Sequence, residues 1–298
     1  MRICNPRQLK EAFLNLVSRR LREEPRCRFI GFDVSRHGLS AGGRVLDMPI
    51  SEEAVLGVAV GLSRAGAEVF VDLMFEAFAC RAWDVLVNQV VLSLVRAASC
   101  APLTVRMLTG PHAGAGPQHG SAIYGLLARL PHIYVAMPAM ADDIDVAYNV
   151  ACQQHHPLIL LSTDSSLSCH VNREEASNIM RIGQGEKLAV FCLPSQMEIV
   201  ADGISAMNAW ESVTILAPLF INPLPLSGLV NAAVKYKSVM LVEGPPPATI
   251  FDQVAMHLFK SHLRRVSTYA LWDSDTIAST NDNVVVRRLV RRIRQEVE

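Results

Sequence analysis

Residues 44–53, with the sequence RVLDMPISEE, decide the fold more than any other part of the chain. They predict a turn that delivers a carboxylate, Glu52, to the start of an apolar helix over residues 53–64. A half-buried glutamate has a raised pKa, so Glu52 is a candidate acid/base group. The alternative is a helix cap, in which Ser51 is the capping residue and Glu52 and Glu53 are favourable at the positive end of the helix dipole.

The composition indicates a chain with much apolar surface to bury in a core or against partner subunits. Half of the 298 residues are hydrophobic, yet no apolar stretch reaches the roughly 18 residues that a membrane helix needs. Basic and acidic residues number 28 each, which argues against electrostatic binding of nucleic acid. We therefore expect neither membrane nor nucleic acid as a partner. The arginine-rich run over residues 287–294 is expected to be the solvated face of a last helix.

The seven cysteines are scattered, and no two of them form a C-x-x-C pair. Most lie in apolar runs, which indicates buried thiols in a reducing compartment rather than disulfides or a zinc site. Residues 1–6 have no apolar segment typical of a signal peptide. We therefore expect a cytoplasmic protein, with no metal site formed by its own side chains.

Strand-like and helical segments alternate along the chain, which predicts an α/β fold with parallel strands and helical crossovers. In the first half, strands are expected over residues 27–34, 69–75, 103–108, 133–137 and 158–161, and helices over 53–64, 80–98, 121–130 and 142–154. The polar stretch 165–187 breaks the alternation and is interpreted as a linker. A second, smaller alternation follows, so we expect two parallel-sheet domains, residues 1–164 and 188–298.

Three segments carry the candidate chemistry. They are PISE (residues 49–52), FEAFACRAWD (75–84) and the Gly/Pro-rich loop GPHAGAGPQHG (110–120). The second and third follow expected strands. In parallel α/β sheets ligands bind at the carboxyl ends of strands, so these two segments are expected to lie at a binding edge.

The order and spacing of these segments resemble the beta subunit of thiamine-diphosphate-dependent 2-oxoacid dehydrogenases, which act on pyruvate, branched-chain or acetoin substrates. The wider resemblance is to the C-terminal half of transketolase. The likeness runs from residue 27 to the end and is strongest over residues 44–84. It implies a thiamine-diphosphate pyrimidine-binding domain followed by a transketolase C-terminal-like domain.

The resemblance implies roles for four side chains at the cofactor. Glu52 matches the glutamate whose carboxylate hydrogen-bonds a ring nitrogen of the aminopyrimidine and so promotes loss of the thiazolium proton. Phe78 matches the aromatic residue that stacks on the pyrimidine. Phe75 and Arg81 are expected near the same ring. For the two phenylalanines the alternative is ordinary core packing.

The Gly/Pro-rich loop contributes two candidate histidines. His119 matches the family's active-site histidine, which assists proton transfer or stabilises charged intermediates. The alternative is a loop histidine that caps the next helix. His112 shares the loop and is the second candidate for contact with substrate.

The chain lacks the G-D-G motif with a following asparagine pair that holds Mg²⁺ and diphosphate. The resemblance therefore implies an alpha-type subunit that binds Mg²⁺, with thiamine diphosphate between the subunits of an α2β2 heterotetramer. A lipoyl acyltransferase is a further candidate partner.

The reaction implied is decarboxylation of a 2-oxo acid, with transfer of the acyl or aldehyde unit to lipoamide or a carbonyl compound. The alternatives are the C-terminal half of a split transketolase or acyloin carboligase that transfers a ketol unit, and a non-catalytic structural subunit.

Overall fold

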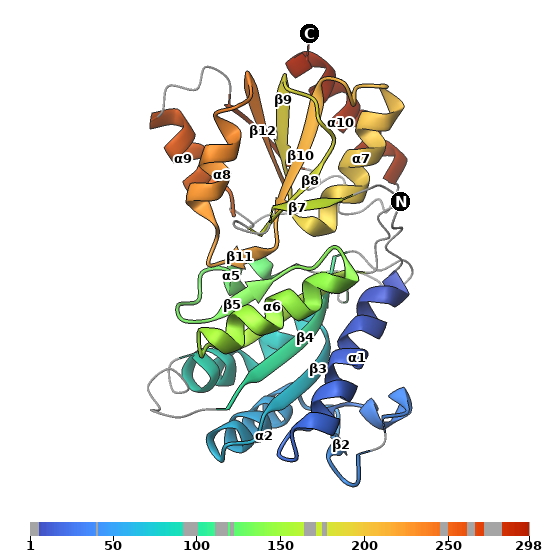
Figure 1. Ribbon diagram of the computed structural model, residues 1–298, viewed down its shortest axis with the longest axis vertical. Helices are drawn as coiled ribbons and strands as arrows, with labels where there is room; N and C mark the ends of the chain where they lie inside the picture. Colours follow the sequence, from blue (N-terminus) through green and yellow to red (C-terminus); the bar gives the residue numbers. More distant parts are fainter. Residues whose placement is uncertain are drawn as a thin grey trace. The chain divides into compact units, whose positions relative to one another are not determined.

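The computed structural model describes residues 6–39, 41–91, 101–110, 119, 122–163, 171–174, 178–244, 250–260, 266–270 and 282–297. The chain divides into two compact units, one of residues 5–164 and one of residues 165–298 with 1–4. Each unit has a sheet of parallel or mainly parallel strands with helices packed on it (Figure 1). The predicted α/β fold class is therefore confirmed.

The first unit has parallel strands in the order β5-β6-β4-β3-β1-β2. These are β1 (Arg28–Gly31), β2 (Val45–Asp47), β3 (Val69–Phe75), β4 (Leu103–Thr109), β5 (Tyr134–Ala136) and β6 (Leu158–Thr163). Among the described residues of this unit, the α-helices are α1 (Pro6–Glu23), α2 (Glu52–Arg64), α5 (Tyr124–Leu127) and α6 (Ala141–Gln153). The described residues also form two 3₁₀ helices, η1 (Val34–His37) and η2 (Glu76–Ala82), and a π-helix, η3 (Val85–Val91).

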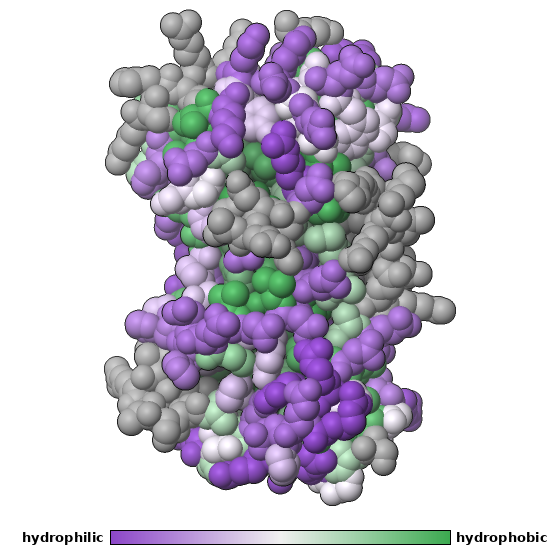
Figure 2. All heavy atoms as spheres, viewed as in Figure 1, coloured by the Kyte–Doolittle hydropathy of each residue, from purple (hydrophilic) through white to green (hydrophobic). Residues whose placement is uncertain are grey.

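Helices cover the sheet of this unit in two layers. Helices α1 and α6 pack side by side on one face, and α2 packs with η2 and η3 on the other (Figure 1). The central strands β4 and β6 are buried along almost their whole length. Strands covered on both faces consist of continuous apolar runs, which explains why these segments lack an alternating pattern. Figure 2 shows hydrophilic side chains gathered over α1 on this face of the molecule.

Several elements differ from the sequence-based prediction. Helix α1 and the short edge strand β2 were not predicted. The prediction of a long helix over residues 80–98 is wrong at its start, where the chain forms η2 and then η3. Its last part, within residues 92–100, lies outside the described residues. Four of the seven residues of η3 are valines, whose branched side chains disfavour a regular α-helix. The helix expected over 121–130 is confined to α5.

The second unit has its described strands in the order β13-β12-β9-β10-β8-β7. They are β7 (Asn172–Glu174), β8 (Ile179–Ile182), β9 (Leu188–Phe191), β10 (Val213–Pro218), β12 (Ser238–Glu243) and β13 (Val266–Ala270). The short strand β11 (Phe220–Asn222) follows β10 and is not part of this sheet. Helices α7 (Met197–Ala206) and α10 (Asp282–Val297) pack together, as do α8 (Leu226–Ala233) and α9 (Asp252–Lys260), and η4 (Pro194–Gln196) precedes α7. The four strands from β13 to β10 are parallel.

The segment expected to be a linker, residues 165–187, contains two strands. Strand β8 pairs antiparallel with β10, and β7 pairs antiparallel with β8. The physical reason is that Ile179, Met180 and Ile182 are buried, so this part belongs to the sheet although its surroundings are polar. The expected solvated arginine face of the last helix is confirmed, since Leu289 and Ile293 of α10 are buried. Its exposed arginines are Arg287, Arg288, Arg291 and Arg294.

No helix in the described part of the chain is both long and apolar enough to cross a membrane.

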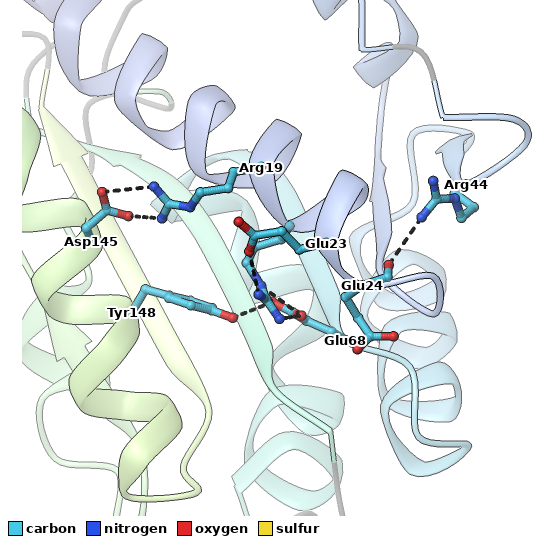
Figure 3. A network of polar contacts seen from close by, with 8 residues as sticks. Arg19, Glu23, Glu24, Arg44, Glu68, Asp145 and Tyr148 are labelled. Atoms are coloured by element: carbon cyan, nitrogen blue, oxygen red, sulfur yellow. Dashed lines mark hydrogen bonds and ion pairs between the residues drawn. The ribbon is translucent and has the colours of Figure 1, made fainter.

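A polar network ties α1 and α6 to the amino end of β3 (Figure 3). Arg20 of α1 binds the buried Glu68 carboxylate with two nitrogens, Nε at 3.1 Å and Nη2 at 2.8 Å. Tyr148 of α6 donates to Glu68 Oε1 at 2.5 Å. Glu68, which immediately precedes β3, is therefore held from both helices of this layer.

Replacing Tyr148 by phenylalanine is expected to lower the free energy of unfolding by about 1.5–3 kcal/mol, because hydrogen bonds to a buried charged group are worth about that much. Arg19→Ala is the matched control on the same two helices. Its ion pair with Asp145 has side chains 41% and 47% exposed, so a change of about 1 kcal/mol or less is expected. Urea unfolding measures both, and equal losses in the two variants would contradict the structural role assigned to Glu68.

Candidate active site

The carboxyl ends of three neighbouring strands present polar side chains at one edge of the first sheet. Glu76 directly follows β3, Thr109 ends β4 and Thr163 ends β6. Strand β4 is parallel to both of its neighbours, so these ends share an edge. This is the edge at which parallel α/β sheets bind ligands.

A bulge at the end of β3 sets the direction in which the chain leaves the sheet. The register between β3 and β4 shifts between Asp72 and Phe75, and Met74 adopts a left-handed φ of 65°. The Asp72 carboxylate stabilises this turn, since Oδ1 accepts from the Met74 N–H at 3.0 Å. Its Oδ2 pairs with Arg106 Nη1 at 2.8 Å, and both side chains are under 10% exposed. Bulges and left-handed residues of this kind concentrate next to functional sites.

Three of the side chains singled out from the sequence meet directly after this bulge. The Phe75 and Phe78 ring centroids are 5.4 Å apart, and the His119 ring lies 4.8 Å from Phe75 and 5.4 Å from Phe78. All three contacts are edge-to-face, the arrangement that ring quadrupoles favour. Both phenylalanines are only half-buried, so part of each ring remains available to a ligand.

Glu52 is the first residue of α2, as the sequence predicted for the start of that helix. Ser51 is the capping residue, and its hydroxyl accepts from the Ala54 N–H at 3.4 Å, so the helix cap considered as the alternative for this segment is present. Glu52 is half-buried, and α2 packs against η2, the helix that carries Phe78.

Two further candidates, Arg81 and His112, are not among the residues of the ring cluster that Phe75, Phe78 and His119 form in the described part of the chain. Arg81 is on η2, and its side chain is exposed. His112 lies outside the described residues. Among the described residues, no group of three or more His, Cys, Asp or Glu side chains is placed to hold a metal ion.

Glu76 was not singled out from the sequence, yet it is a buried carboxyl at this edge whose pKa is clearly raised. Its side chain is 1% exposed, and Oε1 accepts from the Ile123 N–H at 3.1 Å. Burial raises the pKa of Glu76 to about 8, and its contacts with the Thr109 hydroxyl and the Ile123 N–H oppose that rise. Neither Oε2 nor Thr109 Oγ1 has a hydrogen-bond partner of good geometry in the described part of the chain. The sequence feature that could have pointed to Glu76 is its position directly after an apolar strand and between two phenylalanines.

Comparison with protein families identifies this unit. Residues 7–168 match the family described as transketolase, pyrimidine binding domain. The chain belongs to this pyrimidine-binding family. The ring cluster and Glu52 both lie within the matched residues.

Curated relatives of this family member include beta subunits, as their names state. It is 22% identical over 222 residues to the beta subunit of acetoin:2,6-dichlorophenolindophenol oxidoreductase from Bacillus subtilis, covering 71% of this chain and 65% of the relative. It is 23% identical over 266 residues to the mitochondrial pyruvate dehydrogenase E1 beta subunit of Chaetomium thermophilum, covering 80% and 69%. The corresponding subunit of Rhizobium meliloti is 25% identical, covering 73% and 50%. The matches thus span between half and about two thirds of the relatives' own length.

Solved structures agree on the fold. A structure titled as a split gene transketolase, an inactive beta4 tetramer, superposes with a TM-score of 0.77 at 18% identity, covering 97% of both chains. The transketolase of Campylobacter jejuni gives a TM-score of 0.70 at 12% identity, covering 96% of this chain and 46% of that one. This family member therefore has the transketolase-like fold.

Proposed function

We propose that the chain is the beta-type subunit of a thiamine-diphosphate-dependent enzyme, with the cofactor at its interface with an alpha-type subunit. The enzyme decarboxylates a 2-oxo acid and transfers the acyl or aldehyde unit to lipoamide or a carbonyl compound. The observation that carries the proposal is the meeting of Phe75, Phe78 and His119 at the binding edge of a pyrimidine-binding domain.

The side chains of this edge fit the aminopyrimidine of the cofactor. The half-buried rings of Phe75 and Phe78 offer apolar surface to a flat heterocycle, and the Glu52 carboxyl suits a ring nitrogen that carries a proton. His119 is in contact with both rings and can accept or donate a proton near the reacting atoms. When bound, thiamine diphosphate supplies the electron sink that loss of CO₂ requires.

The exposed surface of α2 supports an obligate partner. Ile50, just before the helix, is 74% exposed, and Val58 is 40% exposed. Gly57 and Gly61 are also exposed, and apart from the backbone of α2 itself no described atom lies within 4 Å of a Cβ built on either. An apolar face with small residues allows another chain to approach closely, as in the core-like interfaces of obligate complexes. We assign this face to the alpha-type subunit, which would hold Mg²⁺ and the diphosphate.

A split transketolase is the second candidate. It is favoured by the match of nearly full length, 97% of both chains, to the split gene transketolase structure. A transketolase would transfer a ketol unit between sugars, whereas a dehydrogenase-type enzyme consumes a 2-oxo acid.

An assay of donors separates the two candidates. The complex with the alpha-type partner is given thiamine diphosphate, Mg²⁺ and either a panel of 2-oxo acids with 2,6-dichlorophenolindophenol as electron acceptor, or a ketose phosphate with an aldose acceptor. We expect reduction of the dye with a 2-oxo acid and no ketol transfer. Ketol transfer without dye reduction would replace the first candidate by the second.

Replacing Phe78 by alanine is expected to weaken thiamine-diphosphate binding to the complex by about 5- to 150-fold, because stacking of an aromatic side chain on a base is worth about 1–3 kcal/mol. Phe259→Ala is the control, since Phe259 is 83% exposed and lies on α9 of the second unit. Calorimetry on the assembled complex measures both. Equal affinities for wild type and Phe78→Ala would remove Phe78 from the cofactor site.

A further inference from the structure

Glu76 lies between the two ends of the segment that carries His119. The chain enters this segment after Thr109, at the end of β4, and leaves it at Ile123, just before α5. Glu76 Oε1 accepts from the Ile123 N–H at 3.1 Å, and the Thr109 hydroxyl is close enough to lower the pKa of the carboxyl. One buried carboxyl therefore hydrogen-bonds one end of the segment, at Ile123, and lies near the other end, at Thr109.

The same part of the chain also supplies the rings that contact His119. Glu76 begins η2, Phe75 directly precedes it and Phe78 lies two residues further on. The described contacts between this part of the chain and the His119 segment include the edge-to-face ring contacts and the hydrogen bond of the Glu76 carboxyl. Displacing the carboxyl would remove that hydrogen bond.

The surroundings of Glu76 suit a neutral carboxylic acid. Burial raises its pKa, and no charged group in the described part of the chain is among the causes. A neutral acid has one O–H donor besides its acceptor oxygens, so it can bind an N–H with one oxygen and face a hydroxyl with the other. An ionised carboxylate at 1% exposure without a cation would be costly. The titratable or charged groups on the described elements packed against η2, and on η2 itself, are Glu52, Glu53, Arg64, Asp72, Arg106, Cys80, Arg81 and the nearby His119.

We propose that Glu76 is a positioning residue for His119, and that its buried carboxyl, which binds the Ile123 N–H, keeps the histidine against the Phe75–Phe78 pair. The consequence for catalysis rests on the proposed function, because it assumes that His119 acts on the substrate. The geometry itself belongs to this chain alone. Ionisation of Glu76 at alkaline pH introduces a charge without a partner, which releases His119 from the rings.

The test follows the His119 ring by NMR in the full-length chain labelled with ¹³C at histidine Cε1. The His119 signal is assigned by its absence in His119→Gln. Because two aromatic rings lie within 5.4 Å, the signal is displaced by ring currents, and the displacement reports whether His119 is in place. Spectra are recorded from pH 6.5 to 9.5 for wild type, Glu76→Gln, Glu76→Ala and Glu186→Gln, whose carboxyl is exposed in the second unit.

In wild type and Glu186→Gln we expect the ring-current displacement of the His119 signal to be present at pH 6.5. It should be lost as the pH rises, with an inflection near pH 8, in addition to any shift that titration of the imidazole itself causes. Glu76→Gln, which keeps an acceptor and cannot ionise, should retain the displacement to pH 9.5. Glu76→Ala should lack it throughout; if that variant does not fold, wild type against Glu76→Gln decides.

Identical titrations of wild type and Glu76→Gln, or loss of the displacement in Glu76→Gln at pH 6.5, would overturn the proposal. A chain that shows the expected spectra but forms no thiamine-diphosphate-dependent enzyme would refute the proposed function and leave the positioning role intact.

Discussion

Replacing Glu52 by glutamine in the assembled complex is expected to lower turnover by about 10²- to 10⁴-fold, the range that a positioned acid/base group contributes. Glutamine keeps the size of the side chain but cannot share a proton with a ring nitrogen. The loss should persist at saturating thiamine diphosphate, because the carboxyl acts on the reactivity of the bound cofactor. Initial rates at increasing cofactor concentration separate this effect from weaker binding.

Glu53→Gln is the matched control for this prediction. Glu53 lies in the same first turn of α2, and its side chain is exposed. Both substitutions remove one negative charge near the positive end of the helix dipole, so a loss of helix stability would appear in both. Turnover within about twofold of wild type is expected for Glu53→Gln. If Glu52→Gln were equally active, Glu52 would be only part of the cap and the chain would fit a non-catalytic structural subunit.

Replacing Asp72 by alanine is expected to lower the free energy of unfolding by about 3–5 kcal/mol, the usual cost of leaving one partner of a buried ion pair uncompensated. The Arg106 guanidinium, 5% exposed, would lose its carboxylate, and the Met74 N–H would lose its acceptor. Because Met74 has a left-handed backbone, the change should also disturb the bulge that leads into Phe75 and Glu76.

A double substitution distinguishes loss of the pair from loss of packing. Asp72→Leu with Arg106→Met removes both charges and keeps apolar volume, and such replacements are often neutral or stabilising. We expect the double variant to recover most of the stability that Asp72→Ala loses in urea unfolding. A double variant as unstable as the single one would mean that the Met74 turn, rather than the uncompensated charge, determines the cost.

The parallel sheets could be predicted because their strands are apolar along most of their length and alternate with helical segments. Helix α1 could also have been predicted, since Leu9, Phe13 and Val17 recur at helical spacing and are buried. The strand β8 could not, because the burial of its side chains depends on pairing with β10, which lies some thirty residues further along the chain.

In the candidate site, too, some residues could be predicted from the sequence and others could not. Phe75, Phe78 and His119 stood out because each follows an expected strand and matches a family position, and the structure brings their rings together. Glu76 and Asp72 did not stand out, because their burial depends on the loop end at Ile123 and on the facing Arg106. The bulge at Met74 is equally a property of the folded sheet rather than of a local motif.

The most direct test of the central claim is calorimetric titration of thiamine diphosphate with Mg²⁺ into the purified chain alone and into its complex with the alpha-type partner. A site divided between two subunits predicts binding to the complex and none to the chain alone. Micromolar binding by the chain alone would contradict the divided site and indicate a self-sufficient enzyme, and binding by neither would contradict the cofactor assignment.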